Sequence, residues 1–275
     1  ERSTTVIDGH ASIGATMLQT SDTFCFELNQ QLIIDSILFN NQIIPFARNG
    51  HITYALPGNP LMAGSSVLMN IYYRGNAFVP GAAAIGNGFT HNNSNVWGDT
   101  AVFSLSQPYS AYEWFPCKQF LLDKADSSWF FITTSNENMA GSNGLLEGVD
   151  TLAATQQLRF RWKSHYPIDY YLISVAVAKY LDYTFYAHPS SLPNDSIKIV
   201  NYLYRTNPQT FLTIKPHLDS VALMLEYYSD LFGLYPFHEE KYGHCMTPFG
   251  GGMEHQTMTS TEYAGFFTLL AHELL

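Results

Sequence analysis

The sequence has little charge, and almost none of it is clustered. Charged residues make up 13% of the 275 positions, with 13 Lys and Arg against 23 Asp and Glu. The chain contains no basic run, so we do not expect nucleic acid as a partner, because its recognition depends on clustered cations. The net charge of −10 mildly favours ligands that carry an ammonium group, and it mainly favours solubility.

Cysteine is also scarce. Cys25, Cys117 and Cys245 are far apart, odd in number and not arranged as C-x-x-C. This pattern indicates neither a disulfide framework nor a cysteine-based zinc site, and we expect Cys117 and Cys245 to be small buried apolar residues. No apolar run approaches the ~20 residues of a membrane span. No signal peptide is seen, which leaves the compartment open between periplasmic, secreted and cytoplasmic.

What the chain does have is apolar and aromatic side chains, at 46% and 15% of its residues, which is a folded globular composition. Short β-branched and aromatic runs, separated by Gly, Pro and Asn, predict a mainly β region from about residue 6 to 190, built as a sandwich or a saddle-like open sheet. The expected strands are 31–39, 42–46, 51–56, 65–73, 128–133, 158–162 and 170–180. Residues 81–95 are rich in small and polar side chains and predict a loop.

The pattern changes near residue 213. Apolar residues then recur at helical spacing from Leu218 to Phe232, with Thr213 as the expected N-cap and Gly233 as the stop signal. Residues 241–247 predict a buried strand, and residues 264–275 predict a second apolar helix. This change indicates two domains, residues 1–190 and 191–275, with a boundary around residues 186–193.

Two features near the end of the chain carry chemistry. His272 and Glu273 begin the zinc-peptidase pattern H-E-x-x-H, whose second His would fall at position 276, beyond Leu275. Upstream, a run of three glycines leads directly into Met253, Glu254 and His255. Taken separately, each feature is more often an ordinary helix surface or an ordinary turn.

Together the two features resemble the M1 (gluzincin) aminopeptidases, in which a G-x-M-E-N motif precedes H-E-x-x-H. Residues 251–254 match that motif, and His255 replaces its usual Asn. Further stretches resemble family landmarks in the family's order: residues 114–117 (WFPC), 171–177 (YLISVAV) and 231–241 (LFGLYPFHEEK). The resemblance implies a β-saddle N-terminal domain followed by an incomplete α+β thermolysin-like catalytic domain.

The resemblance also implies how a free N-terminus is held. Glu254 and Gln107 would accept hydrogen bonds from the substrate ammonium group; Gln107 lies eight residues before the Phe of the F-P-C segment and is followed by Pro108. Gly251, Gly252 and Met253 would let the substrate backbone lie along a strand edge. Without the resemblance, Gln107 would be a loop residue and the glycines a plain turn.

The same resemblance implies one zinc ion. His272 would be a ligand, and Glu273 would be the general base that acts on the metal-bound water. The family's second His, a further Glu and a downstream Tyr are not within these 275 residues. We therefore expect the chain alone neither to hold zinc tightly nor to hydrolyse peptides, and to expose apolar surface along residues 266–275 that favours self-association.

Two alternatives stay open. The chain could belong to a non-catalytic binding or scaffold relative of the same fold, or to a related hydrolase with a non-peptide substrate such as an epoxide. The preferred N-terminal residue, the oligomeric state and the role of His255 are not decided by the sequence. We expect His244 to line the core or a pocket, and His165, His188, His217 and His238 to lie at the surface.

Overall fold

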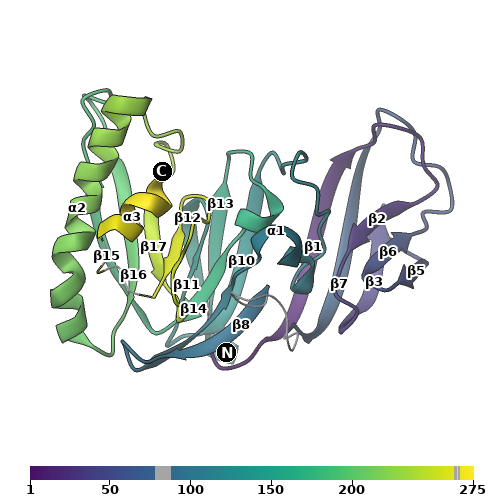
Figure 1. Ribbon diagram of the computed structural model, residues 1–275. Helices are drawn as coiled ribbons and strands as arrows, with labels where there is room; N and C mark the ends of the chain where they lie inside the picture. The colour runs from purple at the N-terminus through teal and green to yellow at the C-terminus, as the bar shows by residue number, and fades with distance from the viewer. Residues whose placement is uncertain (78–87, 263–264, 266) are drawn as a thin grey trace. The chain divides into compact units, whose positions relative to one another are not determined.

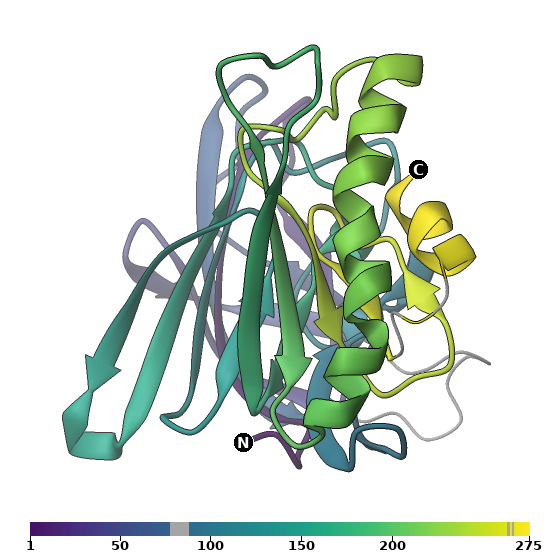
Figure 2. The ribbon, with the colours of Figure 1, turned by 90° about the vertical axis from the view of Figure 1, so that its left-hand side faces the viewer.

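The computed structural model describes residues 1–77, 88–262, 265 and 267–275. They form two compact units, which interleave along the chain (Figures 1 and 2). The smaller unit comprises residues 5–90 and 105–123, and the larger unit comprises residues 1–4, 91–104 and 124–275. These units do not correspond to the two domains expected at residues 1–190 and 191–275, and that domain division stays a prediction.

The smaller unit contains two antiparallel sheets. The first has the order β1-β7-β3-β4 and the second the order β2-β6-β5. The strands of the first sheet are β1 (Val6–Thr16), β7 (Ser66–Asn76), β3 (Leu32–Phe39) and β4 (Gln42–Ile44). Those of the second are β2 (Phe24–Glu27), β6 (Ile52–Ala55) and β5 (Phe46–Asn49). Alternate residues of β7, such as Met69 and Ile71, are fully buried, as one-sided burial of a sheet requires.

Strand β1 was not among the expected strands, although it has 11 residues. Its sequence, VIDGHASIGAT, is rich in small and polar side chains, and none of its residues is fully buried. It pairs with β7 along its whole length, from Val6 opposite Asn76 to Thr16 opposite Ser66. Strand pairing with β7 therefore defines β1, and this information is not contained in the segment itself.

The larger unit contains three sheets, with orders β10-β13-β12, β11-β14-β9-β8 and β15-β16-β17-β19-β18. The strands of the first two are β10 (Ser128–Ser135), β13 (Gln157–Ser164), β12 (Leu145–Leu152), β11 (Met139–Ser142), β14 (Val175–Ala178), β9 (Asp99–Ser104) and β8 (Phe89–Ser94), which begins in the smaller unit. The loop expected over residues 81–95 is wrong where β8 lies, and residues 78–87 are outside the described residues. The strand expected over residues 170–180 is also shorter, because a 3-10 turn occupies Tyr170–Leu172.

The third sheet is mixed. Its strands are β15 (Tyr180–Ala187), β16 (Ile197–Tyr204), β17 (Tyr242–Met246), β19 (Thr259–Thr261) and β18 (Gly252–Met253). β16, β17 and β19 run parallel, and the outer strands β15 and β18 pair antiparallel. Two parallel neighbours need a crossover connection, which α2 (Pro208–Phe232) provides between β16 and β17. The strand expected over residues 241–247 is confirmed as β17.

Helix α2 begins earlier than the sequence indicated. Asn207 is its N-cap and accepts a hydrogen bond from the Thr210 backbone N–H at 3.1 Å, and Pro208 is the first helical residue. Thr213 is therefore an interior residue, and Pro216 lies inside the helix instead of in its first turn. The buried stripe includes Leu218, Val221 and Leu225 as expected, and the helix ends before Gly233.

The second helix, α3 (Phe267–Leu274), lies against α2, where the Tyr228 hydroxyl donates to the Ala271 carbonyl at 3.4 Å. Residues 264 and 266 of the expected helix are outside the described residues. Cys117 and Cys245 are buried, as predicted, whereas Cys25 is exposed. No helix in the described part of the chain combines the length and the apolar character needed to cross a membrane.

Asn143, in the turn between β11 and β12, joins three segments of the larger unit. Its side-chain N–H groups donate to the carbonyls of Leu172 at 3.0 Å and Gln256 at 2.6 Å, and its side-chain oxygen accepts from the Ser174 N–H at 2.7 Å. The side chain is completely buried. Because buried backbone groups need partners, this one amide fixes where residue 256 lies relative to the interior.

We expect Asn143→Ala to lower the free energy of unfolding by about 3 kcal/mol, because it leaves two buried backbone groups and one half-buried group without partners. Urea unfolding followed by far-UV circular dichroism measures this loss. Asn136→Ala, at an exposed asparagine, is the matched control and should change stability by less than about 0.5 kcal/mol. Equal stability of the two variants would contradict the structural role of Asn143.

Candidate active site

The glycine run ends in β18, the edge strand of the mixed sheet. Gly252 lies opposite Thr261 and Met253 opposite Ser260 in the pairing of β18 with β19. Gly251, just before the strand, has a φ of 142°, a conformation that side chains disfavour, so glycine is required there. The outer edge of β18 has no partner strand among the described residues, as a backbone-binding edge requires. The Met253 side chain is buried, so only its backbone is available at that edge.

The two halves of the sequence signal meet in this structure. A Cβ atom built on Gly252 would lie 2.2 Å from Oε1 and 2.4 Å from Cδ of Glu273. The Glu273 carboxylate, on α3, is therefore packed directly against the bare backbone of β18. Only glycine at position 252 leaves room for it.

The charge of Glu254 acts on the Glu273 carboxylate. Burial raises the pKa of Glu273, the negative charge of Glu254 raises it further, and His272 opposes the rise. Glu273 is half-buried, whereas Glu254 is exposed. Of the two groups, Glu273 is thus the one whose surroundings favour the protonated form, and Glu254 is the more accessible to solvent.

Two tyrosines for which the sequence predicted no role in the site also belong to this region. Burial and then the charge of Glu254 raise the pKa of Tyr171, and burial also raises the pKa of Tyr242, which is affected by the charge of Glu273. The Tyr242 hydroxyl lies 3.1 Å from Oγ1 of Thr259 and 3.5 Å from Nε2 of His244. The sequence signal that could have found Tyr242 was its position two residues before His244, because residues two apart lie on the same face of a strand.

His244 is a core residue, as predicted. It is completely buried, and its Nδ1 lies 2.7 Å from the Asn201 side-chain oxygen. Burial lowers the pKa of His244 to about 3, so the ring is neutral at physiological pH. His165 and His188 are exposed as expected, whereas His217 and His238 are partly buried.

The residues after Glu254 form a tight turn that is anchored from inside the unit. The Met258 N–H donates to the His255 carbonyl at 3.0 Å, and Thr257 has a φ of 64°, which is uncommon for a residue other than glycine. The Thr257 hydroxyl accepts from the Gly144 N–H at 2.8 Å. The Lys241 amine donates to the Thr257 carbonyl at 2.9 Å and to the Ser142 carbonyl at 3.2 Å.

Lys241 is therefore a buried amine whose nearest partners are neutral oxygen atoms. It is 1% exposed and also lies 5.2 Å from the ring centre of Trp162. Burial lowers the pKa of Lys241 to about 7, although Glu240 opposes this. Nothing in the sequence indicated this role, because Lys241 is there simply the first residue of an expected strand.

The donor set fits a zinc site only in part. His272 is exposed in the last turn of α3 and supplies one imidazole. The described residues contain no group of three or more His, Cys, Asp or Glu side chains that could hold a metal ion. Because catalytic zinc normally has three protein ligands, His272 can supply one ligand of such a site and the other ligands would have to come from elsewhere.

Gln107 lies in the smaller unit, so its pairing with Glu254 stays a prediction. Gln107 begins α1 (Gln107–Ser110), where its φ of 44° and the 82° of Tyr109 are both positive. Such strained positions persist only where the surroundings hold them. Here Glu113 is buried and accepts from the Gly88 N–H at 2.6 Å, and the Trp114 indole donates to Ser106 at 2.9 Å.

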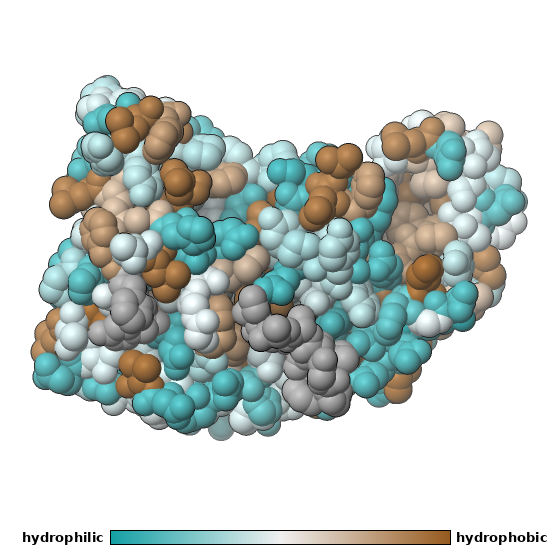
Figure 3. All heavy atoms as spheres, viewed as in Figure 1, coloured by the Kyte–Doolittle hydropathy of each residue, from teal (hydrophilic) through white to brown (hydrophobic). Residues whose placement is uncertain are grey.

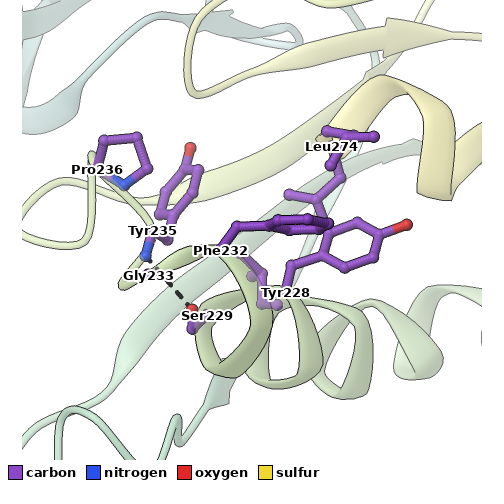
Figure 4. A pocket seen from close by; sticks show the side chains of 9 residues that line it. Tyr228, Ser229, Phe232, Gly233, Tyr235, Pro236 and Leu274 are labelled. Atoms are coloured by element: carbon purple, nitrogen blue, oxygen red, sulfur yellow. Dashed lines mark hydrogen bonds between the residues drawn. The ribbon is translucent and has the colours of Figure 1, made fainter.

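An apolar pocket of about 100 Å³ lies between the ends of α2 and α3 (Figure 4). Tyr228, Phe232 and Leu274 line it, and the Ser229 hydroxyl accepts from the Tyr235 N–H at 3.3 Å. Apolar side chains are also exposed over α2 and α3 in Figure 3, and they include Leu231, Phe232 and Phe267. The apolar surface expected near the end of the chain is present over residues 267 and 275, and self-association stays a prediction.

Comparison with known proteins finds structures with a similar fold but no protein with a similar sequence. No family model and no curated protein matches the sequence. The structure is similar to an M1 zinc metallopeptidase from Deinococcus radiodurans, with a TM-score of 0.83, 18% identity and coverage of 99% of this chain and 60% of that one. The chain therefore has the fold of the matching part of an M1 zinc metallopeptidase, and it spans 60% of that protein's length.

Two ligand-bound variants of such enzymes match equally well. One is a two-domain M1 zinc metallopeptidase bound to L-arginine, with a TM-score of 0.84, 17% identity and coverage of 99% and 60%. The other, from Deinococcus radiodurans, is bound to a Tyr-Ser-Ala substrate, with a TM-score of 0.81, 17% identity and the same coverage.

We expect the free energy of unfolding to increase less with pH in Lys241→Met than in the wild type. Because the pKa of Lys241 is about 7 in the folded chain, against about 10.4 when unfolded, the unfolded state binds more protons between those values. This group therefore makes stability increase as pH rises from about 7 to 10, by at most about 1.4 kcal/mol per pH unit.

Urea unfolding at pH 7.5 and 9 measures the effect as a difference between the wild type and the variant. Lys118→Met, at an exposed lysine of the smaller unit, is the control and should keep the wild-type slope. A Lys241→Met protein whose stability changes with pH as the wild type's does would show that the buried amine is not responsible.

Proposed function

We propose that this chain is the substrate-amine-binding part of a zinc-dependent aminopeptidase, which removes the N-terminal residue of peptides, and that its catalytic region is thermolysin-like. The observation that carries the proposal is the contact of the Glu273 carboxylate with the Gly252 backbone, one residue from Met253 and two from Glu254. The fold shared with M1 zinc metallopeptidases supports it.

Glu254 is proposed as the acceptor for the substrate ammonium group. It is exposed, follows an edge strand and precedes a turn that is anchored from the interior. A carboxylate forms strong charge-assisted hydrogen bonds with an ammonium group, and such a group is present only at a free N-terminus. Gln107 is proposed as the second acceptor. The edge of β18, at Gly251, Gly252 and Met253, would pair with the substrate backbone.

Glu273 is proposed as the general base. Its raised pKa brings the carboxylate closer to the value at which a group both accepts and returns a proton at neutral pH. It would hold the proton of the attacking water and then deliver it to the leaving amine. His272 is proposed as one ligand of a zinc ion, which when bound would polarise the substrate carbonyl and acidify water.

The proposal predicts that the full-length protein containing this chain hydrolyses aminoacyl 4-nitroanilides but not their N-acetylated forms. Glu254→Ala should lower kcat/KM by about 100-fold, because it removes one partner of a buried charge pair in the complex. Glu147→Ala, at an exposed glutamate of β12, should leave kcat/KM unchanged. Stoichiometric zinc without turnover of any substrate would instead favour a binding or scaffold protein.

A second test moves Glu273 without changing it. In the full-length protein, Gly252→Ala should lower kcat by about 100-fold, since the new Cβ displaces the carboxylate and misplaced groups lose catalysis steeply. The melting temperature should change little, because the displaced atoms are the flexible end of a side chain. Gly250→Ala is the control, as a Cβ there meets nothing within 4 Å. Wild-type kcat in Gly252→Ala would rule out Glu273 as the base.

A further inference from the structure

His255 directly follows the proposed amine-binding residue and faces the opposite way. Glu254 is exposed, whereas His255 is 1% exposed. The imidazole Nδ1 lies 3.0 Å from the hydroxyl of Ser260, in β19. Ser260 is also the pairing partner of Met253. The ring therefore links the residue after Glu254 to the strand that pairs with the residue before it.

The backbone on both sides of Glu254 is consequently fixed. On one side Met253 is held by the β18–β19 pairing, and the His255 N–H donates to the Met253 carbonyl at 2.9 Å. On the other side the turn at residues 255–258 is held by Asn143, Gly144 and Lys241. Among these contacts, the hydrogen bond between His255 and Ser260 is made by the residue that directly follows Glu254.

The second ring nitrogen of His255, Nε2, does not form a hydrogen bond of this kind with any described residue. Nε2 is buried and has no hydrogen-bond partner within the described part of the chain. An unpartnered buried nitrogen costs stability, typically about 1–3 kcal/mol. Burial also lowers the pKa of His255 to about 3, so the ring is neutral and does not compete with Glu254 as a charge.

We propose that His255 is a positioning residue, which holds Glu254 in place for the substrate ammonium group through the hydrogen bond between its Nδ1 and Ser260. This inference rests on the proposed function of Glu254. Holding an acceptor in advance saves the ordering that binding would otherwise require. The loss of the bond should therefore weaken amine binding in the ground state and the transition state alike, which raises KM and leaves kcat unchanged.

Two amides separate the roles of the ring nitrogens. The asparagine side chain places its polar atoms where Nδ1 of histidine lies, whereas the longer glutamine side chain reaches the place of Nε2. In the full-length protein, His255→Asn should keep KM for L-alanyl and L-leucyl 4-nitroanilide within about twofold of the wild type. His255→Gln should raise KM about fivefold to tenfold, the effect of one lost hydrogen bond.

Ser260→Ala removes the same bond from the other side and should raise KM by a similar factor. Combining it with His255→Gln should give no further increase, since both changes break one interaction. If His255→Gln does not fold, Ser260→Ala alone still tests the positioning role, because it removes the hydrogen bond and leaves the imidazole in place. Zinc content and melting temperature, measured for every variant, separate a change in KM from a general loss of structure.

The outcomes distinguish this inference from the function on which it rests. If the full-length protein hydrolyses no free-amine substrate, both are overturned. If it is active but His255→Asn, His255→Gln and Ser260→Ala share the wild-type KM, the positioning role alone is overturned. Effects of Ser260→Ala and His255→Gln that multiply in the double variant would also overturn it.

Discussion

The candidate site depends on how a short, irregular turn is held. Residues 255–258 have no regular hydrogen-bonding ladder of their own, and Thr257 has a backbone conformation that a threonine rarely adopts. The turn is stable because Asn143, Gly144 and Lys241 contribute partners from two other segments of the larger unit. The position of Glu254 therefore depends on the rigidity of this turn. The exposed carboxylate is held in place by buried amide groups and a buried amine that are not part of the exposed surface.

The contact between α3 and β18 has a different physical origin. It is a matter of space, because Gly252 has no side chain and the Glu273 carboxylate occupies the volume that one would fill. Both residues were identified from the sequence, and so was the glycine at 251 that needs a positive φ. The resemblance to the M1 motifs located these residues, whereas each stretch by itself would have been an ordinary turn or helix surface.

Other features could not be predicted from the chain. Asn143 and Lys241 act through backbone groups more than 10 residues away in sequence, and nothing in their local sequence indicates which carbonyl they will meet. β1 is a strand because β7 pairs with it, and β8 lies where small and polar residues predicted a loop. Strands β3, β6, β7, β10 and β17 were predictable because their apolar runs carry the signal locally.

The burial of Lys241 has a chemical consequence. Because the pKa of Lys241 is about 7, a substantial fraction of the amine is neutral and nucleophilic at neutral pH, yet it is enclosed by Trp162 and the carbonyls of Ser142 and Thr257. Acylating reagents that label surface lysines would therefore bypass it in the folded chain and reach it only when the interior opens. Its labelling rate would report on the opening of the interior around the Glu254 turn, which makes Lys241 a built-in probe of that region's local stability.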